Sequence, residues 1–403
     1  MQYAALLLLA ALGTWLFSRV LPGLSRRALI LCALGLIASM ALRAVCLWHV
    51  TYDYIDFLRP WMDRFREGGG LRVLGQSVGD YSPPYLVFLA LISYLDYPDL
   101  ILIKLFSVLF DLLLAWTVMR IVLHASKDLY DEAKARRRAA AGFFAALFFP
   151  TVILNSAYWG QCDSIYAFFA LTGLYQALNK RPWLSVAFFA ISFSLKLQAV
   201  FILPIILVLL VYDRIKLRHL PVFPAVWFVS LLPAAVFGRP LGELFTLYIR
   251  QAGQYKTALS FNAPSVFVFA PGNIAGTADK LGIAASFLFM LLVLLIAIWG
   301  SWRREELSDH HILFTATALC AGIPFLLPFM HERYWYLADV LSVALACLRP
   351  RDIPLAGLML FGSFSGYHAY LVLKYAYDMR AGAACIALAA LLALAELVFE
   401  KSG

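Results

Sequence analysis

The sequence predicts an all-α polytopic membrane protein, a single transmembrane domain that covers residues 1–403. Composition, recurring apolar stretches and the placement of the basic residues each predict this class. Of the 403 residues, 63% are hydrophobic and 14% are charged, and the mean hydropathy is +0.80. Soluble domains have roughly 45–50% apolar and about 25% charged residues. A soluble fold could not bury this much apolar surface.

Apolar stretches of transmembrane length recur along the whole chain. A helix of about 20 residues spans the hydrocarbon core of a bilayer, and the stretches near that length predict roughly 13 crossings. The first stretch lacks the basic start and the small-residue cleavage site of a signal peptide, so we expect it to span as well. The predicted stretches are 3–18, 28–48, 101–123, 140–157, 164–178, 183–195, 197–212, 220–237, 281–300, 312–330, 336–348, 353–372 and 380–398.

Two short apolar regions depart from a simple series of crossings. A crossing at 84–97 would invert every later loop, so we expect a helix that dips into the membrane or lies at its outer interface. The pair 183–195 and 197–212 is also short, with Lys196 and Gln198 at the break. Broken helices at membrane depth are tolerated where protein or a water-filled cavity satisfies the backbone. We therefore expect such surroundings at this break.

The basic residues gather in short loops between the apolar stretches. The net charge is +9, from 33 Lys and Arg against 24 Asp and Glu. In a soluble protein this excess could indicate nucleic acid binding, but here it follows the positive-inside rule for cytoplasmic loops, and we expect no nucleic acid partner. The clusters predicted to be cytoplasmic lie at 19–27, 127–138, 180–181, 214–218, 303–304 and 349–351.

This orientation places the N-terminus outside and the C-terminus inside. The first extracytoplasmic loop is then 49–82 and the second large one is 238–280, with shorter outside segments at 155–164, 331–335 and 373–380. No Gly-rich phosphate loop lies on the cytoplasmic side, where a nucleotide-consuming enzyme would need one. The six cysteines show no metal or disulfide spacing.

Carboxylates stand where the second apolar stretch meets the first outside loop. Asp53, Asp56 and Asp63 are placed there. Such a carboxylate can take a proton from an acceptor hydroxyl if burial keeps it basic and aimed; solvated loop acids are the alternative. Residues 58–65, with Trp61 among them, have the spacing of an amphipathic surface helix, and its aromatic residues are then either site residues or only its membrane-facing side.

Two further outside segments contain polar side chains that suit a sugar. Asp80 and Tyr81 precede the proline pair at 83–84, which forces an extended entry into the next apolar segment. A plain helix start, with Asp80 favourable to the dipole, is the alternative. Gln161 and Asp163 lie in a short turn, where their side chains can bind a sugar. The alternative is that they are ordinary polar residues of a loop.

Lys104 and Asp111 lie inside an apolar stretch, seven residues apart and on one helix face. Charge inside a membrane is expensive and indicates function by default. An ion pair of structural value, with another helix or with each other through an intermediary, is the alternative.

Cations mark the remaining outside segments. Lys196 stands near the outer ends of two short helices, beside Gln198, where a cation can neutralise a phosphate. A turn between two apolar stretches contains His331, Glu332 and Arg333. Its His and Arg are suitable hydrogen-bond donors to a phosphodiester or a leaving phosphate. No second His follows at helical spacing, so we predict no metal site.

In this order the pieces resemble a known family. An acidic first loop with Trp-Met is followed by Asp-Tyr-Ser-Pro-Pro at 80–84, Gly-Gln-Cys-Asp-Ser at 160–164, Ser-Leu-Lys-Leu-Gln at 194–198 and His-Glu-Arg-Tyr at 331–334. From about residue 45 to 340 the chain resembles the GT-C glycosyltransferases, most closely bacterial mannosyltransferase-like proteins related to the GPI-anchor pathway. It is similar over the same stretches to the dolichyl-phosphate-glucose glucosyltransferases.

The resemblance implies a GT-C fold with about 13 spans plus amphipathic helices in the first loop, in a bacterial cytoplasmic membrane with its active site facing outside. It implies inverting transfer of a hexose from a polyprenyl-phosphate donor to a hydroxyl of a glycan, lipid or protein, among membrane lipids. The donor is a co-substrate, and no cofactor is implied, although some GT-C enzymes use a divalent metal. The extra first span departs from the family pattern and bears on the N-terminal topology.

The resemblance also assigns roles. Asp53 is the base, with Asp56 an alternative register, and His331-Glu332-Arg333 stands for the family's His-Glu-Lys motif, with the cation kept. His331, Arg333 and Lys196 would stabilise the leaving phosphate. The predicted substrate-binding residues are Asp56, Trp61, Asp80, Tyr81, Gln161, Asp163, Lys196, Gln198, His331, Glu332 and Arg333.

Two other classes compete with this interpretation. A transporter or a flippase of lipid-linked sugars also has broken helices and buried charges, but the sequence has no inverted repeat and its polar residues gather on one side. A membrane acyl- or phosphotransferase would need a His-Asp or multi-Arg cassette, which the sequence lacks.

Overall fold

The computed structural model describes residues 1–79, 81–254, 257–270, 276–302 and 307–399, and helices dominate these ranges. Two short strands, β1 (Ser260–Phe261) and β2 (Met330–His331), pair in parallel. Asp80 and the predicted basic cluster at 303–304 lie outside the described residues.

The number of helices long and apolar enough to cross a bilayer indicates a polytopic membrane protein. Within the described ranges there are six, or seven if α6 and the bent stretch after it form one span with a 47° bend. The six are α1 (Gln2–Val20), α2 (Arg26–Cys46), α5 (Asp99–Ser126), the stretch Leu217–Val236 that contains α11 (Val222–Val236), α14 (Ala278–Trp302) and α18 (Met379–Phe399).

The other elements are shorter or interrupted. The structure has the π-helical turns η1 (Tyr54–Leu58) and η3 (Leu154–Trp159), the 3-10 turns η2 (Gly70–Gly75), η4 (Leu197–Phe201), η5 (Leu217–His219), η6 (Val266–Phe269) and η7 (Pro350–Asp352), and the α-helices α3 (Arg59–Glu67), α4 (Pro83–Ile92), α6 (Glu132–Phe148), α7 (Pro150–Ile153), α8 (Asp163–Leu178), α9 (Pro182–Leu195), α10 (Ile205–Val211), α12 (Leu241–Phe245), α13 (Leu247–Gln254), α15 (Asp309–Leu326), α16 (Tyr336–Leu348) and α17 (Ile353–Leu371).

Each predicted apolar stretch coincides with a helix or a short run of helices, but the predicted count of crossings is not confirmed. The reason is length. At 1.5 Å per residue, helices such as α9 and α16, with 14 and 13 residues, reach only about 20 Å of a hydrocarbon core of about 30 Å.

Helix α4 enters and leaves on one side of the molecule. After it, Tyr94 donates its hydroxyl proton to the carbonyl of Gly69 at 3.1 Å and accepts from the N–H of Leu71 at 3.0 Å. Arg66, on α3, then pairs with Asp99 at the start of α5. The chain that leaves α4 therefore contacts the loop that precedes this helix.

The first loop carries an amphipathic helix, α3, whose apolar face is buried within the protein. Met62 and Phe65 are 0% exposed and pack with Val73 and Leu89 in a satellite core. Of the two alternatives for the apolar side of this helix, contact with lipid does not apply to Met62 and Phe65, which face the protein. Residues of α4, Leu89 among them, belong to the same buried cluster.

The buried charges of the core belong to structural pairs. Asp111 accepts two hydrogen bonds from Arg43 of α2, from Nε at 3.0 Å and Nη2 at 2.9 Å, and another from the Ser156 hydroxyl. Arg43 and Asp111 are both fully buried. The structural alternative for Asp111 is confirmed, with a partner on a different helix.

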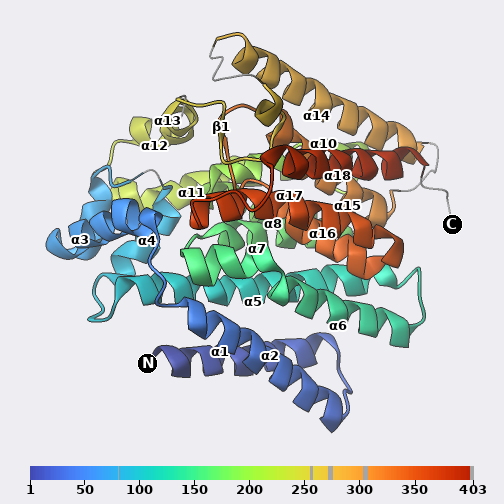
Figure 1. Cartoon of the computed structure of the whole chain (residues 1–403), viewed down its shortest axis with the longest axis horizontal. Coiled ribbons are helices and arrows are strands. Elements are labelled where there is room, and N and C mark those ends of the chain that lie inside the picture. The colour runs from blue at the N-terminus through green and yellow to red at the C-terminus, as the bar shows by residue number, and fades with distance from the viewer. Residues whose placement is uncertain (80, 255–256, 271–275, 303–306, 400–403) are drawn as a thin grey trace.

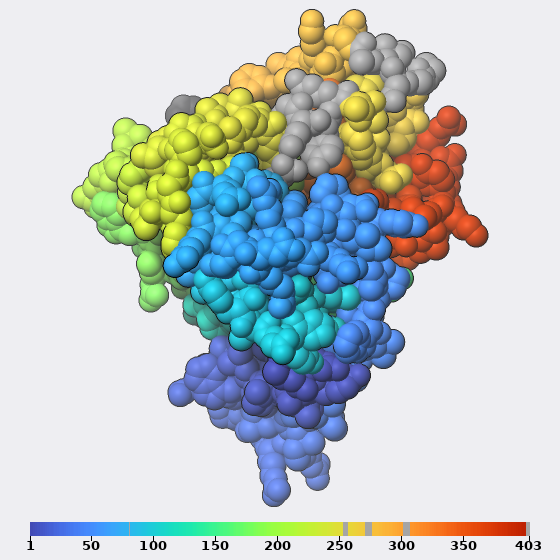
Figure 2. All heavy atoms as spheres, turned by 90° about the vertical axis from the view of Figure 1, so that its left-hand side faces the viewer, coloured from blue at the N-terminus to red at the C-terminus, as the bar shows by residue number. Residues whose placement is uncertain are grey.

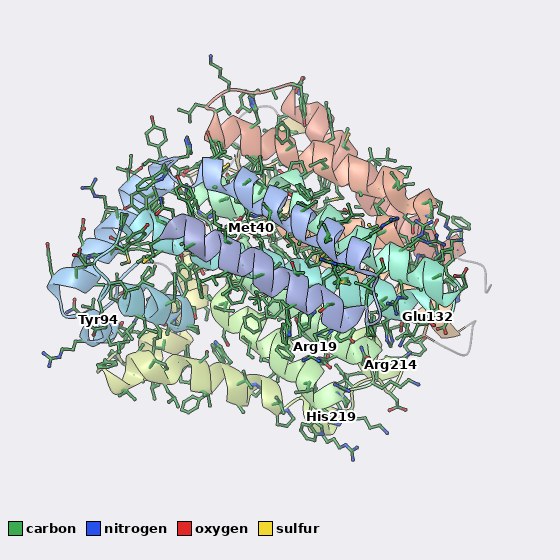
Figure 3. The ribbon with its side chains drawn as sticks, turned by 90° about the horizontal axis from the view of Figure 1, so that it is seen from below. Arg19, Met40, Tyr94, Glu132, Arg214 and His219 are labelled. Atoms are coloured by element: carbon green, nitrogen blue, oxygen red, sulfur yellow. The ribbon has the colours of Figure 1, made fainter. Side chains whose placement is uncertain are left out.

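The long helices run between two ends of the molecule (Figure 1). At one end, called the basic end, the loops with the predicted cytoplasmic clusters meet: the hydroxyl of Tyr130 donates to the carbonyl of Leu348 at 3.1 Å, and Arg214 donates to that of Leu307 at 3.0 Å. Figure 3 shows Arg19, Arg214 and His219 there, with Tyr94 at the opposite end.

The opposite end, called the cavity end, is formed by the loops that carry the predicted site. Figure 2 looks onto this face, where the first loop (blue), α12 and α13 (yellow) and the stretch between α17 and α18 (red-orange) come together. Segments far apart in the sequence thus surround one region.

Candidate active site

A cavity of about 230 Å³ lies among the loops of the cavity end. One water in the liquid occupies about 30 Å³, so the cavity has room for a polar ligand. The first loop, the turn before α8, the break after α9, α13, the segment around β2 and α17 all contribute walls. The lining residues are Asp53, Phe57, Leu58, Trp61, Tyr81, Tyr85, Gly160, Gln161, Lys196, Gln198, Gln251, His331, Arg333, Tyr334 and Tyr370.

Asp53 stands on the cavity wall with both carboxylate oxygens engaged. Its Oδ2 accepts hydrogen bonds from Trp159 Nε1 at 2.8 Å and Gln161 Nε2 at 2.5 Å, and its Oδ1 accepts one from the hydroxyl of Tyr370. A carboxylate has about four lone-pair sites. The three donors therefore orient the group and leave one site for a hydroxyl of a ligand.

The loop that carries this carboxylate is anchored by α5. Lys104 Nζ donates to the carbonyls of Cys46 at 3.0 Å and His49 at 2.6 Å, and the Thr51 hydroxyl donates to the carbonyl of Trp159 at 3.2 Å. Lys104 is 0% exposed, and a buried charge needs such partners because desolvation is costly. Lys104 fixes the end of α2 and does not reach the cavity.

The turn before α8 presents Gln161 to the cavity. Gly160 has a φ of 86°, in the left-handed region that glycine adopts without strain. The turn closes through the N–H of Gly160 donating to Ser156 at 3.0 Å and the N–H of Gln161 donating to Asn155 at 2.9 Å, both to backbone carbonyls. These bonds place the side chains of Trp159 and Gln161 together on Asp53.

Two cations line the same cavity, and each has a buried anionic partner. Lys196, at the break between α9 and η4, pairs with Asp163. Arg333 pairs with Glu332 at 2.8 Å and lies 3.6 Å from Asp163, which also accepts a hydrogen bond from Asn155 at 2.7 Å. Asp163 and Glu332 are each 1% exposed. These four charges form a network at the cavity wall.

Burial sets the protonation of the two residues beside Arg333. His331 stacks on Phe261 with ring centroids 4.8 Å apart. Burial, reinforced by Arg333, lowers the pKa of His331 to about 3, so its ring is neutral near pH 7. Burial raises the pKa of Glu332 to about 7 although Arg333 opposes the shift. The number of negative charges in the network therefore changes close to neutral pH.

The family model of glycosyltransferase family 87 matches residues 80–329, more than half of the chain. The chain belongs to glycosyltransferase family 87. It is therefore a glycosyltransferase, which acts on a sugar donor and an acceptor, and this favours the enzyme over the transporter or flippase. No curated protein matches the chain. The match contains Gln161 and Lys196, whereas Asp53 and Arg333 lie outside it.

The cavity of this family 87 enzyme brings together most of the predicted site residues, but Asp163 and Glu332 do not line it. They lie behind the wall and hold the cations. Asp80 lies outside the described residues. Across the described ranges, no group of three His, Cys, Asp or Glu side chains is placed to hold a metal ion. The predicted residues that line the cavity are Asp53, Trp61, Tyr81, Gln161, Lys196, Gln198, His331 and Arg333.

Asp56 is exposed and does not line the cavity. It lies in η1, and a shift of three residues along a helical turn points a side chain in a different direction. Its predicted contact with the substrate is therefore unsupported, and Asp53 is the first-loop carboxylate that the fold presents to the cavity.

Sequence reasoning did not assign roles to three residues of this site. Trp159 and Tyr370, which stack with centroids 4.6 Å apart, both bind Asp53. Gln251, on α13, lines the cavity, and within the described residues its Oε1 has no hydrogen-bond partner. A glutamine in a predicted outside loop was a weak signal for Gln251, whereas Tyr370 sits inside an apolar stretch that gave none.

Proposed function

We propose that this glycosyltransferase is of the GT-C type and moves a hexose from a polyprenyl-phosphate donor to an acceptor hydroxyl, with inversion at the anomeric carbon. The acceptor is a glycan, lipid or protein. The observation that carries the proposal is the pairing, in one cavity of a membrane protein, of an oriented carboxylate, Asp53, with two cations, Lys196 and Arg333.

Asp53 is the general base of the proposed reaction. The acceptor O–H donates to the remaining lone pair of the carboxylate, the acceptor oxygen attacks the anomeric carbon, and its proton passes to Asp53. The C–O bond to the donor breaks and polyprenyl phosphate leaves with the electron pair. Because the donors from Trp159, Gln161 and Tyr370 fix the carboxylate, the base is positioned before the acceptor arrives.

The cations bind the phosphate of the donor. Lys196 is 5% exposed, and the Arg333 side chain is 16% exposed, so both act where water is scarce and charge interactions are strong. An arriving phosphodiester brings one negative charge to a network that already holds Asp163 and Glu332. Since the pKa of Glu332 is raised to about 7, protonation of Glu332 can release Arg333 to the phosphate. His331, neutral near pH 7, can contribute a hydrogen bond but no charge.

The surroundings of the cavity suit an isoprenoid chain. Trp48, just after α2, and Tyr52, Ile55 and Phe57 on the first loop are exposed by 54%, 59%, 47% and 42%, and Phe57 also lines the cavity. An apolar chain can lie against these side chains while its phosphate enters. Because the basic end has the composition of cytoplasmic loops, we place the cavity on the extracytoplasmic side, in a bacterial cytoplasmic membrane.

The test is transfer of a labelled hexose from a short-chain polyprenyl phosphate by the purified enzyme. Asp53→Asn keeps the size and removes the basicity, so transfer should fall by roughly 10²–10⁴-fold while donor binding survives. Asp56→Asn is the matched control, because Asp56 is exposed and outside the cavity, and it should transfer almost normally. Transfer from a nucleotide sugar but not from the polyprenyl phosphate would overturn the donor assignment.

A further inference from the structure

A second cavity, of about 480 Å³, lies at the basic end. Arg214 and His219, which belong to it, appear in Figure 3 at the opposite end of the molecule from Tyr94. It is therefore separate from the candidate active site. Among its described lining residues, four side chains are basic and one is acidic: Lys180, Arg214, Lys216, Arg218 and Asp213.

The hydrogen bonds of His219 leave its Nε2–H without an acceptor among the described residues of this pocket. His219 is 3% exposed. Its Nδ1 accepts from the backbone N–H of Lys216 at 2.9 Å, so the proton of the neutral ring sits on Nε2. The Nε–H of Arg218 points at that same Nε2 from 3.3 Å. A neutral ring has one acceptor nitrogen, so the Nε2–H of His219 and the Nε–H of Arg218 are two donors side by side, and an anionic oxygen next to both would accept from both.

The rim of the pocket adds an apolar component. Trp183 packs edge-on against His219, with ring centroids 4.6 Å apart, and is 52% exposed. Leu217 is 76% exposed. Tryptophan is enriched at the level of lipid headgroups. The pocket therefore combines basic side chains, two adjacent hydrogen-bond donors at His219 and an apolar rim.

The positive-inside rule accounts for the number of basic residues in this region but not for this arrangement. That rule depends on Lys and Arg count in short loops and requires neither a concave pocket nor a buried histidine. The pair Arg26 and Arg27 follows the rule with exposed side chains on the first turn of α2. The geometry around His219 needs a further explanation.

We infer that this pocket binds a phosphate group at the basic end, that of an anionic lipid headgroup, independently of the donor cavity. Free inorganic phosphate shares this chemistry and is the second source to separate. A phosphate oxygen would lie next to both Arg218 Nε and His219 Nε2, with Lys216 and Lys180 neutralising its charge, and the acyl chains would lie against Trp183.

The experiment uses the full-length protein in nanodiscs of phosphatidylcholine with increasing phosphatidylglycerol. Retained lipid is counted by native mass spectrometry, and the unfolding midpoint is followed by thermal scanning. A Lys or Arg that lies close to an anionic headgroup contributes about fivefold to its binding. The double variant Lys216→Gln/Arg218→Gln should therefore weaken phosphatidylglycerol binding by about 25-fold and lose the thermal shift. Both side chains are exposed, so their removal disturbs little packing.

The matched control is Arg26→Gln/Arg27→Gln, which removes the same charge from another basic loop and should keep wild-type binding. A parallel arm adds inorganic phosphate to phosphatidylcholine nanodiscs. A thermal shift from phosphate alone, lost in the pocket variant, would assign the site to free phosphate. Equal phosphatidylglycerol binding in wild type and both double variants, with no phosphate effect, would overturn the site and leave only the positive-inside bias.

Discussion

The two ends of this family 87 glycosyltransferase treat charge in opposite ways. At the cavity end, Asp163 and Glu332 are buried and hold Lys196 and Arg333 in fixed pairs. At the basic end, charges are mostly solvated: Lys216 and Asp213, 3.9 Å apart, have side chains 53% and 80% exposed. Exposed pairs contribute about 0–1 kcal/mol, whereas breaking a buried pair is costly. At the cavity end charge therefore builds a site, whereas at the basic end it faces water and lipid.

The largest expected difference between the ends is in stability. Asp163→Asn leaves Lys196 without its buried partner, and this should lower the free energy of unfolding by about 3–5 kcal/mol. Asp213→Asn at the basic end should change it by less than about 0.5 kcal/mol. Reversible unfolding of the two variants in detergent micelles measures both changes in the free energy of unfolding. Similar losses in the free energy of unfolding for the two variants would contradict the difference between buried and solvated charge.

Next in size is the use of the donor. Arg333→Gln removes a charged hydrogen-bond donor, each of which contributes about 1.5–3 kcal/mol, so kcat/KM for the donor should fall by about 10- to 100-fold. Arg333→Lys keeps the charge and should recover part of the loss. Arg181→Gln, an exposed basic-end control, should leave kcat/KM unchanged. Monodisperse Arg333→Gln protein with wild-type turnover would remove Arg333 from the site.

A proton-linked effect should be confined to the cavity end. Because the pKa of Glu332 is raised to about 7, ionisation above pH 7 makes Glu332 compete with the donor phosphate for Arg333. The donor KM should rise by about tenfold between pH 6 and pH 8.

Glu332→Gln should flatten this profile, and a steep rise that persists in Glu332→Gln would assign it to another group. The same shift affects folding: the folded state binds the proton of Glu332 more tightly than the unfolded state does. The stabilisation is complete below the unfolded pKa and is lost as the pH rises through about 7.

The smallest predicted effect concerns Gln251, whose Oε1 has no partner within the described residues. If it accepts a hydroxyl of a substrate, Gln251→Ala should raise one KM by about 2- to 10-fold, the range of one neutral hydrogen bond. Thr246→Ala, at an exposed position between α12 and α13, is the control and should leave both KM values unchanged. Kinetics with donor and acceptor varied separately would show which substrate Gln251 contacts.

Sequence reasoning reached the helices and most of the cavity because both leave local signals. Apolar length marks each helix, and a polar residue in an outside turn, such as Gln161 or Lys196, stands out from its neighbours. It could not distinguish a span from a shorter buried helix, since the two share composition. It gave no role to Tyr370, which is placed beside Asp53 only by the packing of α17. It also placed Asp163 in contact with substrate, because sequence cannot distinguish a residue that lines a cavity from the buried residue that pairs with it.

We propose that the donor phosphate binds at the cavity end, opposite Asp53. The direct measurement is a cryo-electron microscopy map of the wild-type enzyme in nanodiscs with a non-transferable phosphonate analogue of a polyprenyl-phosphate hexose. We predict phosphonate density within about 4 Å of the side chains of Arg333 and Lys196, with the sugar reaching toward Asp53. Density for the analogue at the basic-end pocket alone, with the cavity of Asp53 empty, would contradict this placement of the donor.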